Sequence, residues 1–407
     1  VFGASNKYGT FYSLGGAWRV GKEAFLEDVS FLDELKIRAS YGTSGNDRIN
    51  RYAALGLYAL GENYEGQAGI SYAQLANPLL RWEKNTTTDI GLEFSLFGAK
   101  LSGEVSYYKR GSEGILFDKP LSMLTGFETI NTNLASMDNY GVELLLNGSP
   151  LRSESFEWNV SFNLTSNKNK IKAITQDEVI DGTKRWKVGQ DRYQWYLREY
   201  AGVDPEDGSP MWYRDELGTD GLPTGSKITT KSYTSATRYD GLGSALPKFT
   251  GGLNNTFKFQ SIDLSIFTYF SLGGKIYDGL YALSMHNGAS VGQQLAADTE
   301  QAWQKPGDIT GIPRFSVNNT DLGNEQSSRF LYDGSYLRVK NIALGYTLSK
   351  RLLQPLKLSN VRLYLMTENV LTFAKHKGMD PESAINGLSD NEIPNIKTVS
   401  LGLNVGF

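Results

Sequence analysis

Residues 156–165 read Phe-Glu-Trp-Asn-Val-Ser-Phe-Asn-Leu-Thr, an uninterrupted alternation of apolar and polar side chains. Successive side chains of a β-strand point to opposite faces, so Phe156 and Trp158 share one face while Glu157 and Asn159 share the other. The 3.6-residue period of an α-helix would mix both kinds on every face. The stretch therefore predicts a strand with one apolar and one polar face.

The same alternation recurs in residues 35–42, 89–96, 361–368 and 398–407. The polar faces of these stretches combine small and charged residues. On this pattern we place eleven strands, with approximate bounds 8–20, 32–43, 85–97, 99–110, 137–148, 155–166, 247–258, 261–271, 335–348, 359–371 and 396–407. The chain is predicted to be all-β and antiparallel.

Two local features depart from the simple pattern. The apolar side chains change faces between Val339 and Ile342, which predicts a β-bulge near Asn341. Within the long segment 167–246, aromatic residues flank the turn-like sequence Asp-Pro-Glu-Asp-Gly at 204–208. This predicts a further hairpin, either in the main sheet or outside it, and so eleven to thirteen strands.

The lengths of the links favour a membrane β-barrel over a soluble β-sandwich, which would also alternate. Short links (21–31, around Gly98, 149–154, around Gln260 and 349–358) alternate with long links (44–84, 111–136, 167–246, 272–334 and 372–395). Outer-membrane barrels have short periplasmic turns and long extracellular loops, and their tilted strands need about 9–11 residues to cross. We therefore expect a transmembrane β-barrel with its C-terminus in the periplasm.

An odd number of strands does not close a bacterial single-chain barrel, since those barrels are even-numbered. Open sheet edges do not occur in lipid. We therefore expect the rest of the wall to come from N-terminal strands absent from this chain or from a second chain.

Composition and motifs give little support for other classes. The 41 basic and 44 acidic residues give a net charge of −3, so nucleic acid is not an expected partner. There is no Cys, and the two histidines, His286 and His376, are expected to be solvated loop residues rather than metal ligands. No G-x-S-x-G elbow or P-loop is present. We expect no enzyme activity, no metal and no cofactor.

Acidic residues that could suggest a catalytic pair or a calcium loop have simpler interpretations. The carboxylates of the polar faces, including Glu93 and Glu104, are expected to form cross-strand pairs with Lys36, Arg38 and Arg362. The segment 204–208 lacks the ligand spacing of a complete calcium loop. We therefore expect a structural turn there.

Seven segments, in order, resemble SusC/RagA-type TonB-dependent outer-membrane transporters. They are Leu35–Asn46, Asn77–Lys84, Asn139–Leu144, Leu246–Gly252, Asp333–Asn341, Glu368–Phe373 and Gly378–Glu382. Asp333–Asn341, with the sequence Asp-Gly-Ser-Tyr-Leu-Arg-Val-Lys-Asn, is the most specific of them. The resemblance extends over nearly the whole chain.

The resemblance implies a plugged barrel of about 22 strands, of which residues 1–407 are the C-terminal half of a single β-barrel domain. It implies import of oligosaccharides or peptides, energised by TonB and assisted by a SusD-like surface lipoprotein, in the outer membrane of a Gram-negative bacterium of the Bacteroidota. No plug or TonB box is found in these residues. We therefore expect both to lie outside this chain.

An aromatic-rich stretch supplies the candidate substrate-binding residues, because aromatic faces stack on sugars and pack against peptide side chains. They are Trp186, Tyr193, Trp195, Tyr196 and Trp212. The alternative for this set is a buried hairpin or an interfacial aromatic belt. Tyr107, Tyr269 and Tyr346, near strand ends, are expected to be belt residues.

Two other classes of protein remain open. One is a passive or structural barrel subunit that a partner chain completes; residues upstream of Val1 would distinguish it from an importer. The other is a soluble β-rich carbohydrate-binding protein or enzyme, which would be soluble without detergent.

Overall fold

The computed structural model describes residues 2–290, 292–317, 320–382, 385–389 and 392–407. They form two compact units, which are treated separately below. The first unit comprises Val1–Ser149, Asn163–Val179 and Trp186–Arg192, and the second comprises Pro150–Phe162, Ile180–Arg185 and Tyr193–Phe407.

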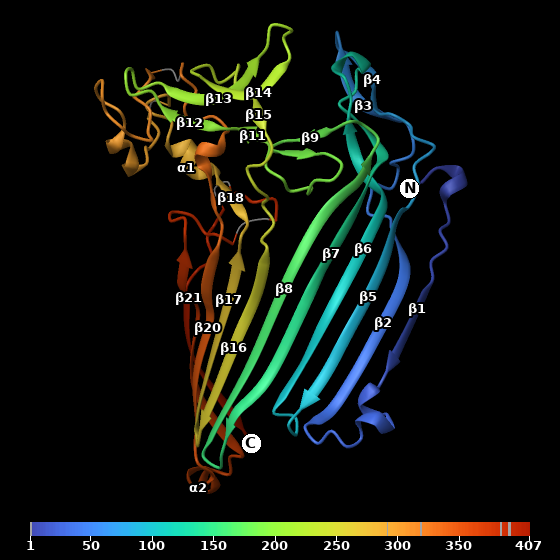
Figure 1. The fold of residues 1–407 in the computed structure, drawn as a ribbon, viewed down its shortest axis with the longest axis vertical. Coiled ribbons are helices and arrows are strands. Elements are labelled where there is room, and N and C mark those ends of the chain that lie inside the picture. Colours follow the sequence, from blue (N-terminus) through green and yellow to red (C-terminus); the bar gives the residue numbers. More distant parts are fainter. Residues whose placement is uncertain (1, 291, 318–319, 383–384, 390–391) are drawn as a thin grey trace. The chain divides into compact units, whose positions relative to one another are not determined.

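Among the described residues, eleven strands form one antiparallel sheet and follow one another in chain order (Figure 1). They are β1 (Ser13–Trp18), β2 (Leu32–Asn46), β5 (Glu83–Leu96), β6 (Leu101–Pro120), β7 (Thr129–Arg152), β8 (Phe156–Ile174), β16 (Phe249–Phe259), β17 (Ile262–Leu272), β20 (Tyr336–Thr347), β21 (Asn360–Ala374) and β23 (Thr398–Gly406). The eleven predicted strands and the antiparallel all-β class are confirmed. Only the first is much shorter than predicted.

Smaller elements occupy the long links. They are β3 (Leu57–Tyr64), β4 (Gln67–Gln74), β9 (Val179–Asp181), β10 (Lys184–Trp186), β11 (Leu197–Arg198), β12 (Tyr200–Val203), β13 (Pro210–Leu217), β14 (Pro223–Thr230), β15 (Arg238–Tyr239), β18 (Lys275–Asp278), α1 (Gly279–Ser284), β19 (Leu331–Asp333) and β22 (Leu388–Ser389); α2 (Lys350–Leu353) lies in a short link. Short 3-10 turns cover Ala4–Asn6, Val20–Lys22, Ala24–Leu26, Met123–Thr125, Ala297–Gln301, Ser328–Phe330 and Gln354–Leu356. None of the helices in the described ranges combines the length and hydropathy needed to cross a membrane.

The apolar face of the first unit carries a continuous row of exposed and half-buried aliphatic side chains. Ile37, Leu92, Val105 and Leu144 are direct neighbours across β2, β5, β6 and β7. Leu92 is 38% exposed and Ile37 39% exposed, which is unusual for aliphatic residues at the centre of a sheet. Rows of this kind suit a lipid-facing wall, because a water-facing sheet would hide them against a second layer.

The polar face of the same strands holds the predicted cross-strand ion pairs. Lys36 Nζ lies 3.0 Å from Glu93, and Arg38 reaches both Asp89 and Glu104. Arg38 lies opposite Gly91, and a Cβ at that position would come within 2.7 Å of the Arg38 side chain. Because Gly91 has no side chain, Arg38 on β2 extends across β5 and reaches Glu104 on β6.

The second unit repeats this arrangement. Arg362 on β21 passes over Gly345 on β20 and forms a 2.5 Å ion pair with Asp263 on β17. The β-bulge predicted near Asn341 is confirmed, because the pairing of β20 with β21 shifts register between Val339 and Asn341. The bulge explains why the apolar side chains change faces along β20.

Replacing Gly345 with alanine should destabilise the protein by about 1 kcal/mol, because the new Cβ would overlap the ends of the Arg362 and Asp263 side chains and displace their partly exposed ion pair. Gly16 in β1 is the matched control, since a Cβ there meets no atom within 4 Å. Gly16→Ala should be neutral or stabilise by up to about 1 kcal/mol through the unfolded chain. Thermal unfolding in detergent measures both, and a larger loss for Gly16→Ala would contradict this interpretation.

Two of the predicted long links differ from expectation. The predicted link 111–136 is wrong for most of its length, because residues 113–120 pair with 129–136 and only residues 121–128, with their short 3-10 turn, connect β6 to β7. The link 44–84 contains a hairpin, β3–β4, that the sequence pattern did not predict. The first difference extends β6 and β7 beyond the stretches with clear apolar alternation, whereas β3–β4 is a separate two-stranded sheet.

The predicted hairpin in 167–246 is confirmed as β12–β13, which flanks the turn at Asp204–Gly208 and belongs to a separate three-stranded sheet. Lys231 lies 2.6 Å from Asp204 and 3.0 Å from Asp207. The predicted structural turn is thus confirmed, since a lysine occupies the space that a cation would take.

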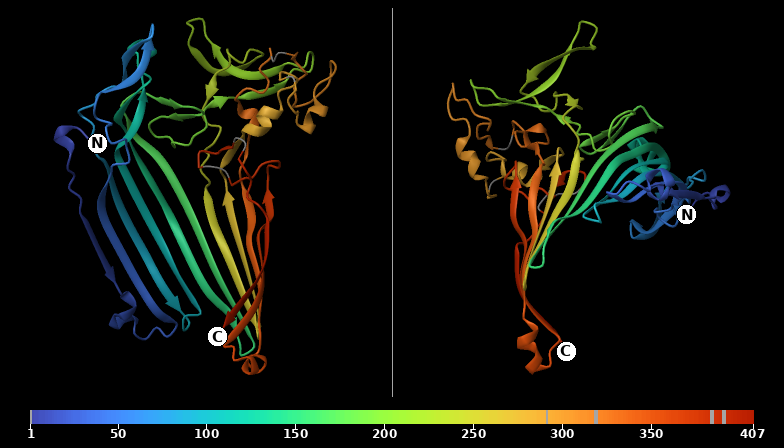
Figure 2. Two further views of the ribbon diagram at one scale, coloured as in Figure 1. Left: turned by 180° about the vertical axis from the view of Figure 1, so that it is seen from behind. Right: turned by 60° about the horizontal axis from the view of Figure 1, so that its bottom comes forward.

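In the second unit, the small strands and α1 gather at one end of β16, β17, β20 and β21, while the C-terminus lies at the other end (Figure 2). The small elements pack around a buried hydrophobic cluster. It consists of Trp195, Leu197, Ala245, Tyr277, Ala282, Met285 and Phe330. The long links of this unit are therefore a packed structure rather than open loops.

Candidate functional site

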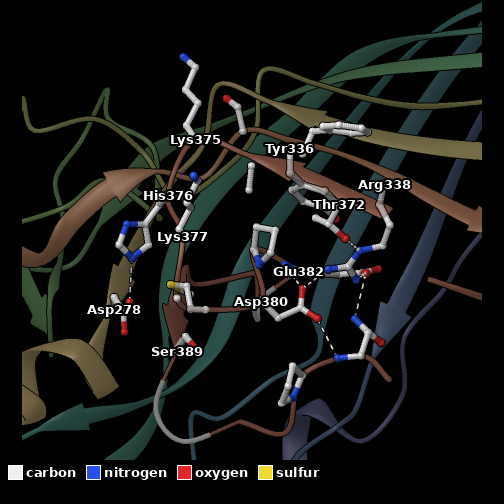
Figure 3. Close-up of a pocket in the computed structure, with 18 of the residues that line it drawn as sticks. Asp278, Tyr336, Arg338, Thr372, Lys375, His376, Lys377, Asp380, Glu382 and Ser389 are labelled. Atoms are coloured by element: carbon white, nitrogen blue, oxygen red, sulfur yellow. Dashed lines mark hydrogen bonds and ion pairs between the residues drawn. The ribbon is translucent and has the colours of Figure 1, made fainter. Parts of the chain in front are cut away.

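A cavity of about 1050 Å3 lies where β20 begins and β21 ends, on the side of the long links (Figure 3). Its lining includes Tyr336, Arg338, Thr372, His376, Asp380 and Glu382. Three of the segments singled out in the sequence, 333–341, 368–373 and 378–382, contribute to this wall. Residues that are far apart in the chain therefore meet at one place.

Arg338 is the centre of this wall. Its side chain is only 3% exposed, and its guanidinium donates to Thr372 Oγ1 at 3.0 Å, to Glu382 Oε2 at 2.6 Å and to Asp380. Lys340 Nζ adds a second cation 2.6 Å from Glu382. Two carboxylates and two cations thus tie the segment after β21 to β20, as the dashed lines of Figure 3 show for Arg338.

The Asp380 carboxylate also holds the chain that follows it. It accepts hydrogen bonds from the backbone N–H of Glu382 at 3.0 Å and of Asn395 at 2.8 Å. Burial alone would raise the pKa of Asp380, but Arg338 and these two N–H donors outweigh it and lower the pKa below its usual range. The Asp380 carboxylate is therefore stabilised in its charged form and holds Glu382 and Asn395 through their backbone N–H groups.

The two histidines are not solvated, so that prediction is wrong. His376 Nε2 forms a 2.8 Å hydrogen bond with Asp278, and its ring stacks on Tyr332 with centroids 3.7 Å apart. His286 is 3% exposed, and its Nδ1 accepts from the backbone N–H of Ser290. Both lie in long links, as predicted, but those links have a core that covers them.

An ion pair between Asp333 and Lys375 lies at the same ends of β20 and β21. Burial would raise the pKa of Asp333, but hydrogen bonds from Lys375 Nζ at 2.7 Å and from the Ser335 N–H at 2.9 Å lower it to about 2. The ordinary value is 3.8. Because the folded pKa is the lower one, the carboxylate stabilises the fold fully above about pH 4, and this contribution is lost as the pH falls toward 2.

We therefore expect the amides of β18 and β19 to lose protection between about pH 4 and pH 2, after correction for intrinsic exchange rates. Lys375→Gln removes one donor to Asp333, so the loss should begin at a higher pH. Hydrogen exchange measured by mass spectrometry at a series of pH values tests this. Identical profiles for the two proteins would contradict the assignment.

The aromatic candidates from the sequence divide between the two units. Trp186 belongs to the core of the first unit, with Phe117 4.9 Å away. Trp195 lies in the core of the second unit, where Tyr193 packs against it. Both indole rings are fully covered by protein.

The other two candidates lie at a group of arginines in the second unit. Tyr196 is half-buried, with the Arg185 and Arg238 guanidiniums 4.4 and 4.7 Å from its ring centre. Trp212 is fully covered, with Tyr233 5.4 Å away. Among the five candidates, Tyr193 and Tyr196 are thus the ones that reach solvent. Direct ligand contact by the set stays a prediction.

Comparison with known proteins identifies the family. The model of the family "TonB dependent receptor-like, beta-barrel" matches residues 2–370. The chain belongs to this family. Its members are outer-membrane transporters rather than enzymes.

Curated relatives match over the whole chain. TonB-dependent receptor P3 of Formosa agariphila is 31% identical, and TonB-dependent receptor SusC of Bacteroides thetaiotaomicron is 28% identical. The chain covers 42% and 41% of their lengths, so it spans less than half of these relatives. The solved structure "Structure of the RagAB peptide transporter" matches all of this chain and 44% of its own chain, with 28% identity and a TM-score of 0.88. The predicted SusC/RagA resemblance is confirmed.

This TonB-dependent receptor barrel has a second cavity, of about 710 Å3, on the polar face of the first unit. Its walls carry Glu83, Asp89, Tyr108, Arg110, Asn139 and Arg192. Tyr108 donates to Asn167 at 2.9 Å, so its hydroxyl is fixed. A wall with fixed donors and acceptors suits polar ligands.

The three tyrosines expected in an interfacial belt differ in exposure. Tyr107 is 43% exposed and Tyr346 47% exposed, so their place in a belt stays a prediction. Tyr269 was assigned to the belt incorrectly, since its ring lies 5.9 Å from Tyr336, which lines the large cavity. It shares the face of Arg338, its partner in the β17–β20 register.

The sequence did not reveal the site residues Arg338, Asp380 and Glu382 as a group. The signal that could have found them was present, because Asp333–Asn341 and Gly378–Glu382 were the segments that carried the family resemblance. Both contain charged residues where a membrane strand meets a link.

Proposed function

We propose that this chain is part of a SusC/RagA-type importer in the outer membrane of a Gram-negative bacterium of the Bacteroidota, and that it takes up oligosaccharides or peptides with energy from TonB. The observation that carries the proposal is the eleven-stranded antiparallel sheet with an exposed apolar row on one face and ion pairs on the other. Such a wall suits lipid on one side and water on the other. The similarity to the RagAB peptide transporter supports the peptide class, and the similarity to SusC supports a TonB-dependent receptor of this type.

The proposal includes the barrel that completes this wall. Residues 1–407 would belong to one barrel domain of about 22 strands, whose remaining strands and plug lie outside this chain or in a second chain. In the second unit, the C-terminal strand β23 ends on the side of the short links. Gly406, its last residue, pairs with Asn360, which begins β21 directly after a short link. This supports a periplasmic C-terminus and extracellular long links.

The proposed partners follow the same sidedness. A SusD-like surface lipoprotein would meet the long links, and TonB would act from the periplasm. Lipid would contact the apolar row.

Growth of a deletion strain tests the proposal. Loss of growth on defined oligosaccharides or peptides as the carbon source, restored by the intact gene, is the expected result. Removing TonB from the same strain should give the same defect. Uptake that continues without TonB would favour a passive barrel subunit over an importer.

A further inference from the structure

Arg198 of β11 and Arg238 of β15 face each other in the second unit, among the small strands above β16 and β17 in Figure 1, and Arg329 follows in a segment that runs beside β11. Arg198 and Arg238 are direct cross-strand neighbours in the β11–β15 pair. Arg198 also forms a parallel bridge with Ser327, two residues before Arg329. We call Arg198, Arg238 and Arg329 the arginine cluster. Directly opposite residues share a face, and like charges there repel each other.

No carboxylate forms an ion pair with the arginine cluster within the part of the chain that the structure describes. Arg238 donates to the carbonyl oxygens of Gly182 at 2.6 Å and Tyr196 at 2.7 Å, and Arg329 donates to that of Gly323 at 2.6 Å. Neutral carbonyls satisfy these donors but do not balance their charge. All three arginines are half-buried, and a charge that is partly removed from water without a counter-ion is costly to a protein.

Neighbouring basic residues differ from the cluster in this respect. Arg185 pairs with Asp240. Lys227 of β14 lies beside the other face of the β11–β15 pair, 3.9 Å from the ring centre of Tyr239, and 2.5 Å from Glu199. The carboxylate of Glu325 acts electrostatically on Tyr233, the ring that contacts Arg198, but Glu325 is itself exposed to solvent. The chain thus supplies counter-ions around the cluster but not to it.

Two donors of the cluster are buried without a hydrogen-bond partner among the described residues: Arg198 Nε and Arg329 Nη2. The indole N–H of Trp212 is in the same situation. Burial lowers the pKa of Arg329 and of Arg238, and the charge of Arg198 lowers that of Arg238 further. Unused donors and mutual repulsion both indicate that an acceptor with negative charge is missing here.

Aromatic rings hold the guanidiniums in place. Arg198 lies 4.2 Å from the ring centre of Tyr233, Arg238 lies 4.7 Å from that of Tyr196, and Arg329 lies 5.6 Å from that of Tyr200. Stacking uses the flat face of a guanidinium, so these ring contacts do not occupy its in-plane N–H donors. The cations are therefore positioned before any ligand arrives.

We propose that the arginine cluster binds an oxyanion of the imported ligand, a carboxylate or sulfate group, and so selects acidic over neutral ligands. Planar guanidinium donors match the two oxygens of such a group. The inference rests on the proposed function for the origin of its ligand and adds the chemical class. Acidic oligosaccharides and acidic peptides share this chemistry, so the experiment separates them.

The test is a binding titration on the purified full-length protein in detergent at low ionic strength. The probes are an oligogalacturonate, a sulfated galactan oligosaccharide and a glutamate-containing tetrapeptide, each against a neutral counterpart. We expect one acidic probe to bind at least about tenfold tighter than its counterpart, and Arg198→Gln to abolish this preference. Lys227→Gln, beside the opposite face of the β11–β15 pair, should keep it.

Arg198→Gln removes one of two repelling charges, so its melting temperature without ligand should equal or exceed that of the wild type. Acidic probes that bind no tighter than neutral ones, or an unchanged preference in Arg198→Gln, would overturn the inference. TonB-dependent uptake of neutral ligands would then leave the proposed function intact. Conversely, acidic binding without TonB-dependent uptake would overturn the proposed function and leave the anion site standing.

Discussion

Replacing Arg338 with methionine should release the segment after β21 and raise amide exchange at Gly378–Glu382 about 100-fold. Arg338 is the 3%-exposed centre of a network with Asp380, Glu382 and Thr372. Removing one partner of a buried ion pair costs roughly 3–5 kcal/mol. Without Arg338, the carboxylates of Asp380 and Glu382 still accept hydrogen bonds from other donors, so we expect a cost near the lower limit, about 3 kcal/mol. This free energy corresponds to a hundredfold change in amide exchange.

Lys340→Met is the matched control, because Lys340 binds the same carboxylate of Glu382 from a more exposed position. Exposed ion pairs contribute less than about 1 kcal/mol, so exchange should rise about fivefold at most. Hydrogen exchange by mass spectrometry on the full-length protein resolves the two. Similar increases in both variants would mean that the segment is held by packing rather than by Arg338.

The wall of this protein could be predicted from sequence because each strand carries its own signal. In residues 156–165 and 361–368, alternation identifies both the strand and its two faces. A shift of the strand register by one residue would move every apolar side chain to the polar face. The bulge near Asn341 was predictable for the same reason. The pairing beyond residue 113 lacks this signal, because residues 113–120 show no apolar alternation, and the alternation in β4 is short.

The site was not predictable in the same way, because its contacts join residues that are distant in the chain. Arg338 and Asp380 are 42 positions apart, and Asp278 and His376 are 98 apart. A histidine in a predicted loop gives no indication that a tyrosine ring will cover it. Tyr196 was selected as an aromatic residue, but the arginines around it carry the chemistry, and no local pattern marks an arginine that lacks a partner.

Leu92→Arg should be the most damaging single change in the wall, with a cost of about 2–4 kcal/mol if the apolar face lies in lipid. Leu92 lies between Ile37 and Val105 in the exposed row, several residues from either end of β5. An arginine there must bury its charge among lipid chains or bend toward the interface.

Glu93→Arg places the same side chain at the same depth on the opposite face, beside water. It breaks the partly exposed ion pairs with Lys36 and Arg38, which should cost about 1 kcal/mol. The folded fraction of each full-length variant, read from the heat-modified mobility of the barrel on gels, measures the difference. Because depth, strand and introduced residue are the same, only the face distinguishes the two variants. Equal yields, or a larger loss for Glu93→Arg, would mean that lipid does not cover the row of Leu92, and the membrane assignment of this face would fail.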